Sequence, residues 1–496
     1  MSIKKLASQT FWYGFSNIFG RFLNYLLTPL LTTIFASEKY GDISILFASA
    51  AFLNIVFTYG METSYFRFNN LYPENEVYNT GLTSIFITTI LFTLVLMIPV
   101  QSLAGLMELK AHPEYIQWLL WIVALDTLAA LPFSKLRHQG RPRKFAMIKV
   151  SNILINIGFV LFFLVWCKGQ YDKKMHNIWS ELYNPQIDIG YVFIANLIAS
   201  GVTLLLLWKE IAAFRPIWNS KLMREILIYS APLVIVGFGG MINDTIDRFM
   251  ITNLYPGSSV EARSANGIYS ANNKLAILIV LFIQAFRMGA EPFFFRQSKE
   301  DNPGKTYARV MKFFVIACCL CFLGVSLFLD IWKYFMGIKS HPEYMKGLVV
   351  VPLLMLSKIF LGVYYNLSIW YKLTSKNWIG ASITLGGAAI TILLNFLLIP
   401  IWGFVGCAIA SLTCYLFMMI VSYTQGQKYY PINYPIKKLI GYVVICLIMV
   451  GLHQFIRSFQ INIIALHSIG FAELIGFVLI VYKIEEKEFK QILSRV

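Results

Sequence analysis

The sequence predicts an all-α, polytopic membrane protein with about 14 transmembrane helices. We expect two parallel six-helix lobes around a central cavity, followed by two further C-terminal helices. Of the 496 residues, 57% are hydrophobic and only 14% are charged, whereas about a quarter of a soluble domain is charged. Apolar runs of about 20 residues, the length that crosses a bilayer, follow one another along the chain, and motifs recur in its two halves. These observations disfavour a soluble enzyme, a disordered chain and a secreted disulfide scaffold.

Polar breaks divide the apolar sequence into 14 expected helices. Their approximate ranges are 10–35, 42–68, 81–108, 114–134, 145–168, 188–210, 225–253, 267–290, 308–330, 346–372, 379–400, 403–424, 437–456 and 462–482. The first run lacks a small-residue cleavage site, so we expect a spanning helix rather than a removed signal peptide. The expected domains are an N-terminal lobe, a C-terminal lobe, two appended helices and a short amphipathic cytoplasmic tail, at 1–210, 211–424, 425–482 and 483–496.

The net charge of +17 is explained mainly by membrane topology. Most of the 42 Lys and Arg residues fall in segments that share a side with the N-terminus, and these residues are enriched on the cytoplasmic side of membrane proteins. An even number of helices then places both termini in the cytoplasm. We therefore expect a cytoplasmic (inner) membrane protein, and no nucleic-acid partner despite the basic charge.

No catalytic centre, metal site or cofactor is predicted. The seven cysteines show no paired loop pattern, and the six histidines show no metal-ligand spacing. The longest outside loop, at about 169–187, is too short for a catalytic domain. The sequence therefore predicts a protein that is not an enzyme.

An internal repeat relates the two lobes. Arg-Phe followed by Pro at 21–29 recurs at 248–256, and Gly-x-Glu-x-x-aromatic-Phe-Arg at 60–67 recurs at 289–296. Both pairs lie about 229 residues apart, which makes the repeat unit six helices. Because six is even, the halves run parallel and are related by an axis along the membrane normal.

A third motif, His-Pro-Glu-Tyr, recurs at 112–115 and 341–344 with the same offset. Proline and an acidic residue are typical of a helix's first turn, so this motif could serve only to start two helices.

The acid and base of the Gly-x-Glu motif lie at the cytoplasmic ends of predicted helices 2 and 8. They are Glu62 and Arg67 in the first copy, and Glu291 and Arg296 in the second. Two interpretations stay open: the side chains pair across the lobes and gate the inner face, or they anchor the helices at the interface.

Polar side chains inside the expected spans mark a candidate site, because charge within a membrane usually faces a wet cavity. Predicted helix 1 carries Asn17, Arg21 and Asn24 on one face, and predicted helix 7 carries Asp244, Asp247 and Arg248. Predicted helix 8 adds two bases, Lys274 and Arg287. The planar fork of arginine matches phosphate oxygens. Alternatively, Arg248 is neutralised by Asp244 one turn earlier, or the acids carry a coupling ion.

Four segments carry a resemblance to a known family. They are Arg-Phe at 21–22, Gly-Met-Glu-Thr-Ser-Tyr-Phe-Arg-Phe at 60–68, Asn-Asp-Thr-Ile-Asp-Arg-Phe-Met-Ile at 243–251 and Leu-Asn-Phe-Leu-Leu-Ile-Pro-Ile-Trp-Gly-Phe-Val-Gly-Cys-Ala at 394–408. The chain resembles the polysaccharide transporter family, the Wzx-type oligosaccharide (O-antigen) flippases of the multidrug/oligosaccharidyl-lipid/polysaccharide exporter superfamily. The resemblance covers nearly the whole chain.

The resemblance implies a fold like that of the superfamily's multidrug (MATE) exporters, with a cavity between two lobes. It implies that a polyprenyl-diphosphate-linked oligosaccharide is flipped from the cytoplasmic to the outer leaflet by alternating access, for O-antigen, capsule or exopolysaccharide synthesis. The implied partners are this lipid-linked sugar, the bilayer, a polysaccharide polymerase and glycosyltransferases, and a coupling H⁺ or Na⁺.

By position, the resemblance assigns the diphosphate and sugar to Arg21, Arg248, Lys274, Asn17 and Asn24. The ion-coupling or gating candidates are Glu62, Arg67, Asp244, Asp247, Arg287, Glu291 and Arg296. Two alternatives in the same superfamily stay open, a cation-coupled multidrug antiporter and a lipid II flippase. The appended helices and excess of buried bases disfavour the antiporter. Lipid II flippases usually carry a denser charged motif on helix 1 than a single arginine.

Overall fold

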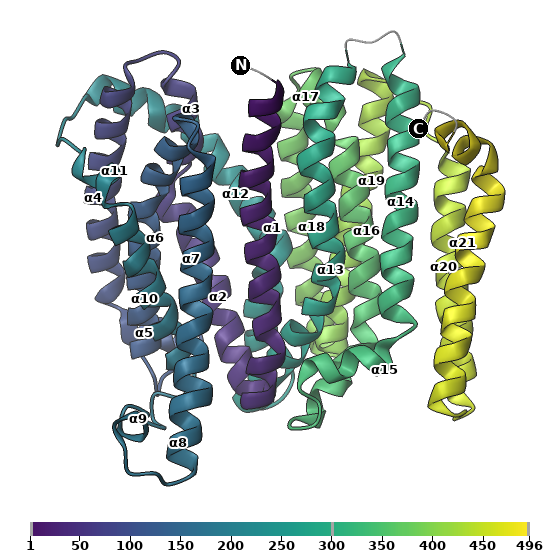
Figure 1. The fold of residues 1–496 in the computed structure, drawn as a ribbon, viewed down its shortest axis with the longest axis horizontal. Helices are drawn as coiled ribbons and strands as arrows, with labels where there is room; N and C mark the ends of the chain where they lie inside the picture. The colour runs from purple at the N-terminus through teal and green to yellow at the C-terminus, as the bar shows by residue number, and fades with distance from the viewer. Residues whose placement is uncertain (1–2, 299–301, 494–496) are drawn as a thin grey trace. The chain divides into compact units, whose positions relative to one another are not determined.

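The computed structural model describes residues 3–298 and 302–493, and within these ranges every regular element is a helix (Figure 1). This confirms the predicted all-α class. The elements are α1 (Ile3–Ile34), α2 (Ser37–Thr58), α3 (Met61–Phe68), α4 (Glu74–Met97), α5 (Val100–Leu106), α6 (Glu114–His138), α7 (Pro142–Leu161), η1 (Phe162–Cys167), α8 (Lys168–Asp172), α9 (Ile178–Glu181), α10 (Gly190–Leu206), α11 (Trp208–Ala212), α12 (Ser220–Leu254), α13 (Ser259–Gln297), α14 (Pro303–Ser326), α15 (Leu329–Trp332), η2 (Lys333–Met336), η3 (Pro342–Val350), α16 (Val351–Leu367), α17 (Ile369–Leu373), α18 (Asn377–Trp402), α19 (Phe404–Tyr429), α20 (Ile436–Ser458) and α21 (Ile463–Leu493).

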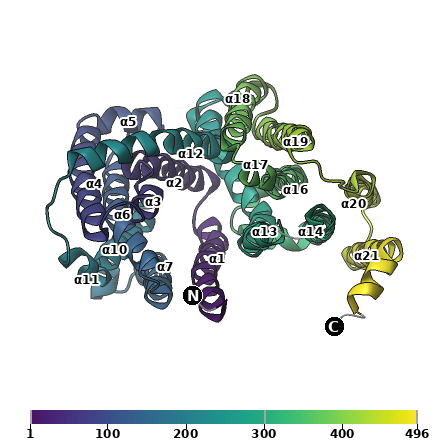
Figure 2. The ribbon, with the colours of Figure 1, turned by 90° about the horizontal axis from the view of Figure 1, so that it is seen from above.

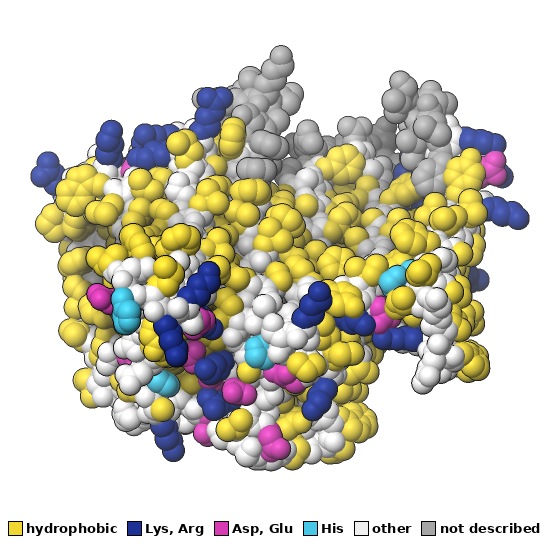
Figure 3. Space-filling view, turned by 60° about the horizontal axis from the view of Figure 1, so that its bottom comes forward, with side chains coloured by type: hydrophobic (Ala, Val, Ile, Leu, Met, Phe, Trp, Pro, Cys, Tyr) yellow, Lys and Arg dark blue, Asp and Glu magenta, His cyan; other side chains and the backbone are white. Residues whose placement is uncertain are grey.

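Twelve helical segments in the described part of the chain are long and apolar enough to cross a membrane. They correspond to 12 of the predicted spans. The other two predicted spans correspond to α1, which carries Arg21 and a polar face, and to α10, which is apolar but has only 17 residues. Hydrophobic side chains cover the flanks of the helices, and charged side chains and histidines gather at the helix ends turned toward the viewer in Figure 3.

The described helices pack into two compact units, Met1–Ser270 with Ile392–Phe404, and Ala271–Thr391 with Val405–Val496. The first unit therefore contains α12 and the first residues of α13 in addition to the first six predicted spans. This grouping differs from the expected lobe boundary at residue 210. The long helix α12 and the start of α13 pack against helices of the first repeat, although they belong to the second repeat in sequence. The division into two six-helix lobes stays a prediction about the repeat.

Inside the first unit, α2 crosses the start of α13 in close backbone contact. A Cβ atom on Gly41 would overlap the carbonyl oxygen of Arg263, and one on Gly267 would overlap that of Ser37. Only glycine lets two helix backbones approach this closely. The hydroxyls of Ser37 and Ser264 hydrogen-bond across the same crossing at 2.7 Å.

The crossing joins positions that the repeat makes equivalent. Ser37 and Ser264 are 227 residues apart, and Ser44 donates to Ser270, 226 residues further on, at 2.7 Å. These separations are close to the repeat offset. Equivalent residues touch each other only near a two-fold axis, so the contact supports the parallel repeat predicted from the motifs.

The His-Pro-Glu-Tyr motif forms the same local arrangement twice. His112 and Glu114 approach to 2.8 Å just before and at the start of α6, and His341 and Glu343 approach to 3.5 Å at the start of η3. Tyr115 and its equivalent in η3 are both fully buried. Both copies therefore start helices, as the simpler interpretation of this motif expected.

The repeats also diverge. Tyr59 and Gly60 have φ angles of 32° and 73°, which end α2 and begin α3, whereas α13 continues without a break through the equivalent Gly289. Conversely, α1 continues through Pro29, and α12 ends before the equivalent Pro256. The copies thus share motifs but place their helix breaks at different points.

In the second unit, α20 and α21 lie side by side (Figures 1 and 2), both pack against α14, and ion pairs tie α21 to α14. Glu485 of α21 is buried and accepts hydrogen bonds from Lys312 of α14, from Lys438 at 2.8 Å and from Tyr442 at 2.6 Å. The segment expected to be a separate tail after residue 482 therefore continues α21 and packs against α14.

Replacing Gly267 with alanine is expected to destabilise the protein, because the added methyl group cannot fit against the backbone of α2. Overpacking of this kind costs about 1–3 kcal/mol, which should lower the melting temperature of the detergent-purified protein by a few degrees. Gly201→Ala is the matched control, since no atom lies near its Cβ position. An unchanged melting temperature for Gly267→Ala would contradict the close crossing.

Replacing Glu485 with glutamine is expected to lower the free energy of unfolding by about 3 kcal/mol, because it leaves buried Lys312 with less compensating charge. Glu486→Gln is the matched control. Glu486 pairs with Lys490 at 2.6 Å, and both side chains are largely exposed, so its loss should cost no more than about 0.5 kcal/mol. Thermal melts of the two variants measure the difference; equal losses would mean that the buried pair does not hold α21.

Candidate functional site

The polar face of α12 contains a buried ion pair. Arg248 donates through Nη1 to the Asp247 carboxylate at 3.2 Å and to the backbone carbonyl of Asp244 at 2.7 Å. The side chain of Asp247 is buried and that of Asp244 is exposed. The acid that neutralises Arg248 is therefore its neighbour Asp247, rather than the acid one turn earlier, because the guanidinium folds back along its own helix.

Tyr40 of α2 connects this face with α1. Its hydroxyl hydrogen-bonds Thr28 of α1 and lies within electrostatic range of Arg248. Thr28 shares its face with Arg21 and Asn24, whose side chains are exposed. Arg21 lies seven residues before Thr28, which is about 10 Å along a helix. Tyr40 therefore lies between Arg248 and the end of the α1 polar face that carries Thr28.

The remaining predicted site residues lie in different places. The side chains of Asn17, Glu291 and Arg296 fall outside the described residues. Lys274 is half-buried in α13, in the second unit, whereas Arg21 and Arg248 belong to the first. The assembly of these three cations into one cavity stays a prediction.

The first copy of the Gly-x-Glu motif has two partners. Glu62 accepts a hydrogen bond from Arg137 of α6 at 2.6 Å, within the predicted N-terminal lobe. Arg67 lies over the ring of Tyr229 of α12, with its guanidinium carbon 4.2 Å from the ring centroid. The arginine therefore contacts the first helix of the predicted second lobe, whereas Glu62 bonds within the first. The sequence pattern did not identify Arg137 as the partner of Glu62.

A tyrosine next to this motif strengthens the contact between α3 and α12. Tyr72, in the turn after α3, donates its hydroxyl to Glu225 of α12 at 2.9 Å. The hydrogen bond to this carboxylate raises the pKa of Tyr72 above its usual value. The end of α3 and the start of α12 are thus joined by polar groups.

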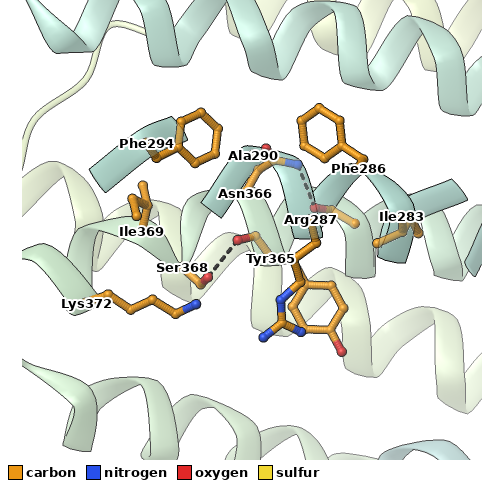
Figure 4. Close-up of a pocket in the computed structure, with 11 residues that line it drawn as sticks. Ile283, Phe286, Arg287, Ala290, Phe294, Tyr365, Asn366, Ser368, Ile369 and Lys372 are labelled. Atoms are coloured by element: carbon orange, nitrogen blue, oxygen red, sulfur yellow. Dashed lines mark hydrogen bonds between the residues drawn. The ribbon is translucent and has the colours of Figure 1, made fainter. Parts of the chain in front are cut away.

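Arg287 lines a small pocket of about 20 Å³ in the second unit (Figure 4). Its guanidinium lies over the ring of Tyr365 of α16, 4.6 Å from the centroid, and Lys372 of α17 approaches the same pocket. A volume of this size holds about one water molecule. The pocket is therefore a packing gap beside Arg287 and does not fit a substrate head group.

Comparison with known proteins identifies a family whose model matches more than half of the chain. The model of a family described as polysaccharide biosynthesis protein matches residues 6–298. No curated protein matches the chain.

Solved structures share the fold at low sequence identity. A lipid II flippase MurJ in an inward closed conformation is 16% identical, with a TM-score of 0.72 over 94% of this chain and 98% of that one. An inward-facing multidrug resistance MATE family transporter of the MOP superfamily is 12% identical, with a TM-score of 0.62 over 82% and 94%. The Vibrio cholerae MATE transporter VcmN in the bent form is 14% identical, with a TM-score of 0.52 over 89% and 98%. These likenesses confirm the predicted exporter-like architecture.

The Asp247–Arg248 pair predicts a loss of stability when it is broken. Asp247→Asn is expected to lower the free energy of unfolding by about 2 kcal/mol, because a buried hydrogen bond between charged groups is weakened. Asp172→Asn, at an exposed carboxylate in α8, is the control and should change it by no more than about 0.5 kcal/mol. Thermal melts in detergent compare the two, and an unchanged melting temperature for Asp247→Asn would contradict the assignment of the partner.

Proposed function

The chain belongs to the polysaccharide biosynthesis protein family, and from this premise we propose that it flips a polyprenyl-diphosphate-linked oligosaccharide across the cytoplasmic membrane. The direction is from the cytoplasmic to the outer leaflet, and the mechanism is alternating access. Family membership and the apolar helices make the protein a multi-pass membrane transporter. The substrate, the direction and the inner membrane belong to the proposal.

The observation that carries the proposal is the extent of the family match. Residues 6–298 include nearly all of α1 and the whole of α12 and α13, and therefore all three candidate cations, Arg21, Arg248 and Lys274. Guanidinium groups bind phosphate oxygens through two parallel hydrogen bonds. An arginine within a membrane-spanning helix is energetically costly unless its charge is compensated. Arg21 is exposed, and binding of an anionic head group would compensate its charge.

The chemistry of such a substrate indicates which residues would bind each of its parts. Arg21, Arg248 and Lys274 bind the diphosphate, Asn17 and Asn24 offer hydrogen bonds to the sugar, and the lipid tail stays in the bilayer. No covalent bond changes, so the protein acts as a transporter and the sugar is handed on unchanged. Glycosyltransferases supply this substrate on the inner side, and a polymerase or ligase consumes it on the outer side.

Reconstitution in proteoliposomes tests the substrate class directly. Polyprenyl-diphosphate oligosaccharides are expected to reach the opposite leaflet, where an added glycosidase or lectin detects them. Lipid II and a cationic drug are offered to the same vesicles as competing substrates. Movement of lipid II alone, or of the drug alone, would replace the proposal with the corresponding alternative of the same superfamily.

Removing either arginine is expected to reduce transport strongly, because the diphosphate loses a positively charged partner. Arg21→Ala and Arg248→Ala should reduce flipping at least tenfold, which corresponds to about 1.4 kcal/mol, at unchanged protein level. Lysine at either position keeps the charge but not the planar fork, so partial activity is expected. Arg143→Ala, at an exposed position at the start of α7, is the matched control. Full activity in both alanine variants would exclude these residues from substrate binding.

A further inference from the structure

A polar hollow lies inside the first unit, apart from the polar faces of α1 and α12. It has a volume of about 270 Å³ and is bordered by α2, α3, α6, α7 and α10. Its polar lining residues are Asn54, Glu62, Asp126, Arg137, Lys149, Asn152 and Thr203. Polar and charged side chains within membrane-spanning helices are costly and usually mark a wet, functional cavity. The hollow is therefore a candidate binding site.

Small side chains on one side of α6 make room for the hollow. Asp126, Ala129, Ala130, Phe133 and Arg137 all line it, and their spacing places them on one face of the helix. The two alanines lie between the two charged residues, and their methyl groups leave a space that larger side chains would fill. The sequence of α6 thus determines both the charged ends of the hollow and its width.

The hollow is open, and its size suits a small polar ligand. Asn54 and Asp126 are exposed, and both also line a second hollow of about 220 Å³. Pockets for drug-sized ligands hold about 300–1,000 Å³, so a volume of about 270 Å³ suits a single sugar ring rather than a whole oligosaccharide. Such a ring can enter without a change in the fold of the unit.

The charges that line the hollow balance one another. Arg137 donates to Glu62 at 2.6 Å. Lys149 interacts electrostatically with Asp126, and its ammonium lies over the ring of Phe133, 4.4 Å from the centroid. An anionic group would be attracted by the two bases and repelled by the two acids, so it gains little. An uncharged polyhydroxylated group fits better, because each hydroxyl both donates and accepts.

Hydrogen bonds to α10 orient two of the polar side chains. Asn152 of α7 donates through Nδ2 to the Thr203 hydroxyl at 2.8 Å, and Ser200 donates to Oδ1 of Asp126 at 2.7 Å. An amide carries two N–H groups and an oxygen, and a carboxylate carries two oxygens. Each side chain is therefore held in place by one polar atom and has further polar atoms that can bond a ligand.

The hollow lies at the level of Arg21 in the membrane. Helix α7, which carries Lys149 and Asn152, packs along α1, and a Cβ atom on Gly20 would overlap the side chain of Ile153. Gly20 precedes Arg21 and Ile153 follows Asn152, so Arg21 and Asn152 lie at nearly the same depth along the two helices. A diphosphate bound to Arg21 would therefore bring the sugar attached to it to the level of the hollow.

We propose that this hollow binds an uncharged sugar ring of the transported head group and that its carboxylates select against acidic sugars. The inference rests on the proposed function for the diphosphate, which Arg21 binds, and adds a separate site for the sugar. Asn54, Asn152 and Asp126 bond the ring hydroxyls. The carboxylates of Asp126 and Glu62 repel the carboxylate of a uronic acid, and no covalent bond changes.

Binding measurements on the full-length protein in lipid nanodiscs test the proposal. The probes are polyprenyl diphosphate alone and the same lipid carrying glucose, galactose, N-acetylglucosamine or glucuronic acid. At least one neutral sugar is expected to raise the affinity about tenfold above that of the bare diphosphate, and glucuronic acid should give no such gain. No gain from any neutral sugar, or an equal gain from glucuronic acid, would overturn the proposal.

Two variants on different helices assign the gain to the hollow. Asn54→Leu removes an exposed amide of α2 and should abolish the gain from the sugar without weakening the binding of the bare diphosphate. Val56→Leu, exposed on the same helix and outside the hollow, is the matched control and should keep the gain. Asp126→Asn preserves the shape but removes one negative charge, so it should raise the affinity for the glucuronic acid lipid. An unchanged gain in Asn54→Leu, or unchanged discrimination in Asp126→Asn, would overturn the proposal.

A third variant separates this inference from the proposed function. Arg21→Ala should weaken the binding of the bare and the sugar-bearing lipids by the same factor, because Arg21 binds only the diphosphate. Binding of the bare diphosphate without any gain from a sugar would overturn the sugar site alone. Failure of every diphosphate lipid to bind would overturn the proposed function, and the sugar site with it. Asn54→Leu decides the test if Asp126→Asn fails to fold, because Asn54 is exposed.

Discussion

The crossing of α2 and α13 at Gly41 and Gly267 is the contact on which the first unit depends. Each glycine faces a carbonyl oxygen of the opposite helix, so neither position accepts any side chain, and the serine pairs on either side of the crossing fix its register. Because the joined positions are equivalent in the repeat, the crossing keeps the start of the second repeat against the first. The contacts of α12 with α2 and α3, including the stacking of Arg67 on Tyr229, follow from that placement.

Charge is distributed in two ways along the membrane-spanning helices. At helix ends it forms structural pairs, such as Arg457 with Asp330 at 2.8 Å, whose partners lie on different helices and hold them together. Some charges nearer helix midpoints lie beside a cavity or an aromatic ring instead, as Asp126 and Lys149 do. Charge at the membrane centre is costly and needs either a partner or water. The first pattern explains how α20 and α21 stay attached; the second marks where function is to be sought.

The sequence predicted what depends on local patterns and missed what depends on tertiary contacts. Helix positions followed from apolar runs, and the two His-Pro-Glu-Tyr copies begin helices because proline and an acid suit a first turn in any fold. The partners of Glu62 and Asp126 could not be predicted, since Arg137 and Ser200 lie 75 and 74 residues away. The buried contacts of Glu485 could not be predicted either, because its partner Lys312 lies 173 residues away.

The membrane potential acts on the charged steps of the proposed cycle. It is worth about 2.3 kcal/mol per charge per 100 mV. Asp247 already balances the charge of Arg248, so in the first unit Arg21 alone offsets part of the charge of a bound diphosphate. The loaded protein would then carry net negative charge outward, and the empty protein would carry the positive charge of Arg21 back inward. An inside-negative potential favours both movements, so the charge of the site itself helps to set the direction of transport.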